Sequence, residues 1–440
     1  MIVLVINHYV SFNYCFNFLL PLLVTTSHKI RGTANCALYD GRVFAPKGNV
    51  ILVTINYRLG ALGYLVDSKR GLKGNFALKD QRLALQWVQK YVRYFGGNPN
   101  RVTIFGESAG AGSVTALLLN RASWGLYSKA ILQSNPLSLP FRDVSSSDSL
   151  GQRFVEEAKC SHDSTLNCIR NLPMDQVVKC GDDASNHLNI FHPIIAFMPW
   201  TPTIDGVELF QQPLEAFRDG NYYKIPIMMG SLSEEAIMFV YLALTSPINS
   251  IEYDAAVAGL FTTSYFDVHK YYPATDSSDQ RPEFSKLGTD YIFTAPTRNA
   301  LMNIHLQQQD TPVYLFFFNH TLSFSDKAFN PRYPFCVGHC CHGSELPILF
   351  GSSTLLNLPL SKEEQVLSDA MVNYWTNFAY TGNPNKAGDG RSTSDLVKWE
   401  PFSSSNLVNM QFETPRVFMN QNLKKTVLDM FDYVGYHHGW

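Results

Sequence analysis

The sequence predicts an α/β fold in which helices cover both faces of a mostly parallel central sheet. Between residues 48 and 134, short apolar runs alternate with longer segments of helical periodicity. This alternation of strand and helix is the pattern that builds a parallel sheet. The chain has 440 residues, 45% of them hydrophobic and 16% charged, which is sufficient to bury a large core.

The first predicted unit is a strand followed by a helix. Residues 50–55, VILVTI, form a continuous and largely β-branched run, which is typical of a strand buried on both faces of a parallel sheet. In residues 80–95, Leu83, Val88 and Val92 recur near helical spacing, and the GGNP sequence that follows stops the helix.

The same unit recurs further along the chain. Residues 101–106, RVTIFG, predict a strand, residues 113–120 a helix, and residues 127–134 a further short strand. Later strands are expected in IPIMMGS, which runs to the region of Gly230, and in TPVYLFFFN. Because there is neither an internal repeat nor a long Pro- or Ser-rich linker, we expect residues 32–440 to form a single domain.

The charge pattern narrows the range of partners. The formal net charge is −2 and there is no block of Lys or Arg, so the sequence gives no support for nucleic-acid binding. A small neutral or weakly charged substrate fits this balance better.

Residues 1–31 form an atypical apolar leader. Polar residues such as Asn7 and Asn13 interrupt it, and no Lys or Arg precedes Lys29. A secretory signal requires a basic start and a small-residue cleavage site, and a spanning helix requires about 20 apolar residues. A signal-like segment, a membrane anchor and a misassigned start all stay open, and a membrane is a partner only if the leader is retained as an anchor.

The segment Gly106-Glu107-Ser108-Ala109-Gly110 matches the G-x-S-x-G pattern of a serine nucleophile on a turn between a strand and a helix. The two glycines leave room for the sharp turn, and the N–H of Ala109 is a candidate oxyanion donor. The pattern is weak alone, but here it follows a predicted buried strand and precedes an apolar helix. This context indicates a catalytic serine rather than an ordinary turn.

A serine nucleophile needs a histidine base and an acid, which follow it in the chain in this type of fold. Glu234 and Glu235 follow the predicted strand near Gly230, and His339 and His342 precede an apolar run. The alternative is that the glutamates start a solvated helix and that the histidines, with three neighbouring cysteines, bind zinc. Spacing alone leaves these interpretations about even.

Five segments carry a resemblance to a known family: NVILVTINYRLGALGYL, GNFALKDQRLALQWVQKYVRYFGGNPNRVTIFGESAGAGSV, KAILQS, HGSELPILFG and YWTNFAYTGNPN. In this order, from about Asn35 to Pro384, they resemble the type-B carboxylesterases, which include cholinesterases and bile-salt-activated lipases. The resemblance implies an α/β-hydrolase fold, a small-molecule ester substrate and hydrolysis through an acyl-enzyme, with neither cofactor nor metal.

Carried over residue by residue, the resemblance makes Ser108 the nucleophile, Glu235 the acid and His342 the base. His342 matches, rather than His339, because the family's histidine directly precedes a glycine. His342 would take the Ser108 proton while Glu235 holds the imidazole tautomer. Glu107 matches a family glutamate that tunes the field beside the nucleophile, and its alternative role is packing.

The cysteines and one sequon favour the secretory pathway, and hence a secreted glycoprotein. Cys160 and Cys168 resemble a family loop closed by a disulfide. In CVGHCCHG, a bridge from Cys336 to Cys340 or Cys341 is favoured over zinc, because zinc would take the histidine that the triad needs. Asn319 lies in an Asn-His-Thr acceptor pattern for N-glycosylation.

One expected part is missing. The family's oxyanion loop is glycine-rich, whereas the corresponding TTSHKIRG has His28 and Gly32 without a glycine pair, and the family's first strands are also absent. The expectation is an incomplete start or a degenerate member. Besides an active ester hydrolase, a catalytically impaired or non-catalytic secreted protein with an adhesive or structural role therefore stays open.

Overall fold

The computed structural model describes residues 2–5, 34, 36–161, 165–185, 198–390 and 392–436. Its strands are β1 (Ile2–Val5), β2 (Ile51–Thr54), β3 (Val66–Asp67), β4 (Leu72–Lys73), β5 (Val102–Glu107), β6 (Lys129–Gln133), β7 (Arg142–Asp143), β8 (Thr203–Ile204), β9 (Ile227–Leu232), β10 (Val313–Phe318), β11 (Val408–Phe412) and β12 (Phe418–Gln421).

The helices are α1 (Gly41–Gly48), α2 (Gly60–Tyr64), α3 (Phe76–Tyr91), α4 (Ala109–Leu119), α5 (Val144–Glu157), α6 (Thr165–Arg170), α7 (Met174–Ser185), α8 (Pro213–Asp219), α9 (Ile237–Ala243), α10 (Ser250–Phe261), α11 (Tyr265–His269), α12 (Arg281–Thr289), α13 (Ala295–Gln307), α14 (Ser325–Phe329), α15 (Leu346–Phe350), α16 (Lys362–Thr381) and α17 (Lys425–Val434).

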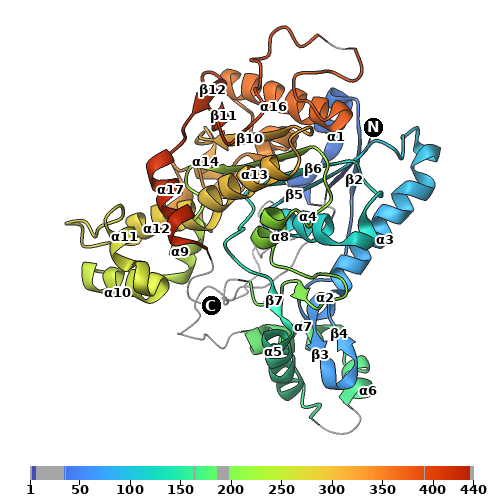
Figure 1. Ribbon diagram of the computed structural model, residues 1–440, viewed down its shortest axis with the longest axis vertical. Helices are drawn as coiled ribbons and strands as arrows, with labels where there is room; N and C mark the ends of the chain where they lie inside the picture. Colours follow the sequence, from blue (N-terminus) through green and yellow to red (C-terminus); the bar gives the residue numbers. More distant parts are fainter. Residues whose placement is uncertain are drawn as a thin grey trace.

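Within the described residues, the central sheet has eight strands in the order β12-β11-β10-β9-β6-β5-β1-β2. All neighbours in it are parallel except β11 and β12. The predicted class, a mostly parallel sheet with helices on both faces, is therefore confirmed (Figure 1).

Alternate residues of the central strands enter two different cores. In β5, Phe105 belongs to a cluster shared with α15 and α16, whereas Ile104 belongs to a cluster shared with α3, α4 and α13. Because side chains of a strand alternate between its faces, this division places the two cores on opposite sides of the sheet. It explains why the sequences of β9 and β10 are largely apolar on both faces.

One expectation about the first strands differs from the structure. The run at residues 50–55 was expected to be buried on both faces, but β2 is the edge strand of the described sheet and its residues are only half-buried. Within the range 1–31, which stays a predicted leader, Ile2–Val5 pair in parallel with both β2 and β5. The other residues of that range lie outside the described residues.

Smaller helical groups surround the sheet. Figure 1 shows α5, α6 and α7 gathered with α2 at the bottom of the view, where Phe154 and Trp200 belong to a separate apolar cluster. The helices α10, α11 and α17 share another cluster around Phe261 and Phe431. The carboxyl ends of β5, β6 and β9 are neighbours in the sheet, and the candidate site is built there.

Candidate active site

Ser108 lies on a strained turn between β5 and α4. Its φ of 58° and ψ of −125° are rare for a residue with a side chain, and such strain clusters at functional sites. A Cβ on Gly106 would lie 2.3 Å from the carbonyl carbon and oxygen of Gly110, so only glycine permits this approach. The Ser108 N–H donates to Gln133 O at 2.9 Å, and Ser108 itself is 8% exposed.

Ala109 is the first residue of α4, as the sequence pattern requires for an oxyanion donor. The N–H groups in the first turn of a helix have no partner within the helix and favour negative charge. The other predicted positions for oxyanion donors, around His28 and Gly32, lie outside the described residues.

Glu235 and His342 are brought together by two segments that are far apart in sequence. Glu235 follows β9, and its Oε1 accepts a hydrogen bond from Leu232 N at 2.8 Å. Its Oε2 lies 2.5 Å from His342 Nδ1. Neither side chain is more than 3% exposed. A bridge between Glu234 and Cys341 aligns the two segments.

Glu234 and His339, the other candidates, pair with each other. His339 Nδ1 lies 2.8 Å from Glu234 Oε1, with side chains 45% and 36% exposed. Cys340 N also donates to Glu234 Oε2 at 2.7 Å. The two acids and two histidines that spacing left equal are thus separated by burial, with one pair in the interior and one near solvent.

The second nitrogen of His342 faces Glu107. His342 Nε2 lies 3.0 Å from Glu107 Oε1. Within the described residues this nitrogen has no hydrogen-bond partner, so Ser108 Oγ is not bonded to it in this geometry. The imidazole packs against Phe239 and Phe293, with ring centroids 4.9 and 5.3 Å away.

The environment of His342 strongly perturbs its protonation. Burial lowers the pKa of His342, but the charges of Glu107 and Glu235 outweigh this effect and hold its pKa well above the usual value. A histidine near two carboxylates in an apolar setting therefore carries its proton to unusually high pH.

A third buried carboxyl group, Glu345, was missed by the sequence analysis. Burial, followed by the charges of Glu107 and Glu235, raises the pKa of Glu345 to about 8. Gln133 Nε2 donates to Glu345 Oε1 at 2.6 Å, and Trp375 Nε1 donates to Gln133 Oε1 at 2.7 Å. The available signal was an acid one position before the apolar run LPILF, in a segment that the structure buries completely.

The cysteine bridges support this arrangement. Disulfides join Cys160 to Cys168 and Cys336 to Cys341, and the second closes the loop directly before His342. Cys340 is a buried free thiol. Among the described residues, no group of three or more His, Cys, Asp or Glu side chains is placed to hold a metal ion.

Asn319, the predicted glycosylation acceptor, is exposed directly after β10. Its Nδ2 donates to Glu413 Oε2 at 3.1 Å.

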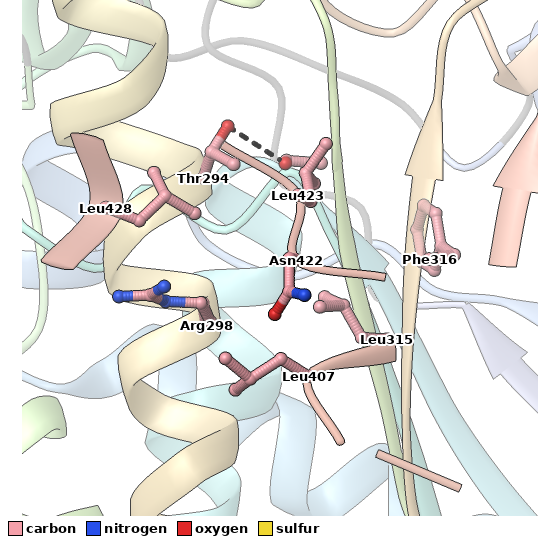
Figure 2. Close-up of a pocket in the computed structure, with 9 residues that line it drawn as sticks. Thr294, Arg298, Leu315, Phe316, Leu407, Asn422, Leu423 and Leu428 are labelled. Atoms are coloured by element: carbon pink, nitrogen blue, oxygen red, sulfur yellow. Dashed lines mark hydrogen bonds between the residues drawn. The ribbon is translucent and has the colours of Figure 1, made fainter. Parts of the chain in front are cut away.

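Figure 2 shows a small cavity between Thr294, Leu315 and Asn422. The hydroxyl oxygens of Thr294 and of Ser231 in β9 lie 3.2 Å apart at its wall. Arg298 and Leu428 also line it. Its volume is about 10 Å³, which leaves room for at most one water. A second cavity of about 20 Å³ touches α4 at Gly112 and Thr115, close to the Ser108 turn.

Comparison with known proteins gives consistent matches along most of the chain. Residues 22–431 match the model of the carboxylesterase family. The crystal protein of Dictyostelium discoideum is 33% identical over 414 residues, covering 92% of this chain and 72% of that protein. Bile salt-activated lipase of Bos taurus is 31% identical over 392 residues, covering 83% of this chain and 62% of the lipase.

Solved structures agree on the fold. A PNB esterase matches with a TM-score of 0.74 at 24% identity, covering 97% of this chain and 81% of that one. A thermophilic PNB esterase matches with a TM-score of 0.75 at the same identity. The expected α/β-hydrolase fold is thereby confirmed.

Proposed function

We propose that Ser108, His342 and Glu235 form the catalytic triad of this chain, which belongs to the carboxylesterase family, and that this triad hydrolyses carboxylic esters. The observation that carries the proposal is the buried contact of 2.5 Å between His342 Nδ1 and Glu235 Oε2, close to the strained Ser108 turn. A carboxylate that accepts from Nδ1–H leaves Nε2 free to act as the base.

In the proposed reaction, His342 Nε2 removes the proton of Ser108 Oγ, and Oγ attacks the ester carbonyl carbon. The negative charge that develops on the carbonyl oxygen is stabilised by the N–H of Ala109. His342 then gives its proton to the departing alkoxide, so that an alcohol leaves and the acyl group stays on Ser108. Water repeats the sequence as the nucleophile, which releases the carboxylic acid and restores the serine.

The Glu107 contact implies one movement before catalysis. His342 Nε2 lies 3.0 Å from Glu107 in the described geometry and must turn towards Ser108 Oγ to act as its base. Catalytic hydrogen bonds are often long or misaligned before substrate binds. Once His342 has lost its proton, the attraction to Glu107 is lost and Nε2 is available to the serine.

A fluorophosphonate probe tests the nucleophile, because it phosphonylates an activated serine. The wild-type protein should be labelled on the peptide that contains Ser108, and Ser108→Ala should lose both labelling and hydrolysis of a p-nitrophenyl ester. Ser113→Ala, in the same helix, is the matched control and should retain both. Equal labelling of Ser108→Ala would refute the assignment.

A structural role without turnover is a second candidate, and one comparison favours it: a relative at 33% identity is a protein named for crystals. Folded protein that neither labels nor hydrolyses esters would support this role.

We also propose maturation in the secretory pathway, with a glycan on Asn319. Two disulfides within the described residues and the exposed acceptor support it, because disulfides persist in oxidising compartments. Glycosidase treatment of secreted material should lower its mass, and the same treatment of Asn319→Gln should produce a smaller change. An equal change in both would place any glycan elsewhere.

A further inference from the structure

The solvent face of α3 and of the short 3₁₀ turn that follows it (Val92–Phe95) is unusually apolar. Leu83, Trp87, Tyr94 and Phe95 are 64%, 45%, 85% and 64% exposed. We call this set, which consists of three aromatic residues and Leu83, the aromatic face. Figure 1 shows α3 along the outer edge of the molecule, at the right of the view.

The spacing of the aromatic face makes it a continuous stripe. Leu83, Trp87 and Tyr94 follow one another at intervals of four and seven residues, which is one side of a helix. The opposite side, with Leu85 and Val88, is fully buried in the core. The helix therefore needs none of the exposed side chains for its own packing, and their exposure calls for another explanation.

The helix end that carries the stripe is held firmly. Gln89 Nε2 donates to Pro99 O and to Leu126 O, both at 2.8 Å. Within the stripe, the Trp87 ring lies 5.8 Å from that of Phe95. These contacts keep the aromatic side chains together on one rigid surface.

The sequence around the aromatic face is basic, and Glu208, an acid that lies against α3, is paired with Arg82 at 2.5 Å. No Asp or Glu occurs between Gln81 and Phe105, whereas Lys90, Arg93 and Arg101 in this range are exposed. The adjacent loop at residues 121–129 also contains basic residues and no acid. Asp80, at the start of the helix, is already paired with Arg58 at 2.7 Å.

A second exposed apolar surface gives a useful contrast. Ile251 and Phe266, on α10 and α11, are 79% and 83% exposed. Their neighbours Glu252 and Asp267 are exposed acids. On that surface the exposed acids directly adjoin the apolar side chains in the sequence, whereas no acid adjoins Trp87, Tyr94 or Phe95.

We propose that the aromatic face docks onto a membrane surface that contains anionic lipids. Amphipathic Trp, Tyr and Phe side chains favour the boundary between headgroups and acyl chains, and Lys and Arg beside them attract anionic headgroups. No helix in the described part of the chain is long and apolar enough to cross a bilayer. The proposed docking uses the surface of α3 and is independent of the proposed triad.

Vesicle co-sedimentation tests the proposal. The full chain should bind vesicles of phosphatidylcholine with about a third phosphatidylserine, and bind pure phosphatidylcholine much less. Lys90→Gln with Arg93→Gln should lower the partition coefficient about 30-fold, since each charge near the surface contributes about fivefold. A triple replacement of Trp87, Tyr94 and Phe95 by Gln should also lower binding strongly, and added salt should weaken it.

The matched control is Ile251→Gln with Phe266→Gln, which removes two equally exposed apolar side chains from the acidic surface and should bind like the wild type. Equal loss in this control, or unchanged binding of both α3 variants, overturns the proposal. So does a dimer in sedimentation velocity that dissociates in the triple variant while vesicle binding is absent, because a second copy of the chain would then be the occupant.

Discussion

Replacing Glu107 by Gln should move the acid limb of the pH–rate profile to lower pH. The amide keeps the size of the side chain and removes its charge. Burial lowers the pKa of His342 while Glu107 and Glu235 raise it, so loss of the Glu107 charge lets the pKa fall. Because the base must be unprotonated to act, kcat/KM rises with pH through the pKa of His342 in the free enzyme. A lower pKa of His342 therefore lets kcat/KM rise at lower pH.

The size of the effect follows from the distance between the charges. Two unit charges 3.0 Å apart attract by about 1.4 kcal/mol in water and by about 5.5 kcal/mol at an effective dielectric constant of about 20. One pKa unit corresponds to about 1.4 kcal/mol. Since both groups are buried, the limb should move by at least about one pH unit.

The assay is kcat/KM for a p-nitrophenyl ester from acidic to alkaline pH, because the raised pKa of His342 places the wild-type limb above the usual histidine range, with folding checked by circular dichroism at each pH. Glu234→Gln is the matched control: it makes the same chemical change in a half-exposed acid that faces His339, and it should leave the limb in place. An acid limb at the wild-type position in folded Glu107→Gln, with a uniform change in rate, would refute the electrostatic reasoning.

Three further predictions concern stability, measured by urea unfolding. Gly106→Ala should lower the free energy of unfolding by about 3 kcal/mol or more, because its Cβ would lie 2.3 Å from backbone atoms. Gly112→Ala, whose Cβ would meet nothing within 4 Å, should leave stability unchanged or raise it, and equal effects of the two variants would contradict the close-approach argument. Replacing Cys160 and Cys168 by Ser should cost about 2.5 kcal/mol through the loop of separation 8, and no loss would show that the bridge does not constrain the unfolded chain. The pKa of Glu345 is about 8 in the folded chain, against about 4.3 in an exposed glutamate, so the unfolded chain loses this proton at lower pH and the free energy of unfolding falls as pH rises between these values. Glu345→Gln should make this pH dependence shallower, and an unchanged dependence would contradict the burial argument.

The strands in the interior of the sheet were predictable because burial on both faces requires apolar residues in the local sequence. In β9 and β10 both faces are covered, so most residues are apolar and the runs stand out in the sequence, and the first four residues of β5, VTIF, form a shorter run of the same kind. The order of the strands within the sheet gives no such pattern in the local sequence. Residues 50–55 read as an interior strand, yet β2 is the edge strand of the described sheet, and Ile2–Val5 lie between it and β5. Position within a sheet depends on distant segments that local periodicity does not record.

The candidate site likewise has parts that the local sequence predicts and parts that it does not. The Ser108 turn was predictable because its glycines, its serine and its flanking elements are contiguous. The partnership of Glu235 and His342 spans 107 residues, and only the family resemblance favoured it over Glu234 and His339. Glu345 was missed because an acid in a sequence is ordinarily a surface residue, and its burial arises from strands and helices brought together by the fold.

The charges around His342 link its protonation state to the group that its Nε2 faces. Nδ1 of His342 is held by Glu235 and Nε2 faces Glu107, and the proposed triad requires Nε2 to turn from Glu107 to Ser108. A protonated ring has an N–H at both nitrogens and is stabilised between two carboxylates, which is the contact that the structure describes. When the Nε2 proton leaves, that nitrogen becomes an acceptor and two acceptors facing each other at 3.0 Å no longer attract, whereas the hydroxyl of Ser108 can donate to it. Under the proposed triad, deprotonation thus both creates the base and releases it towards the serine, and Glu107 sets the pH at which this happens.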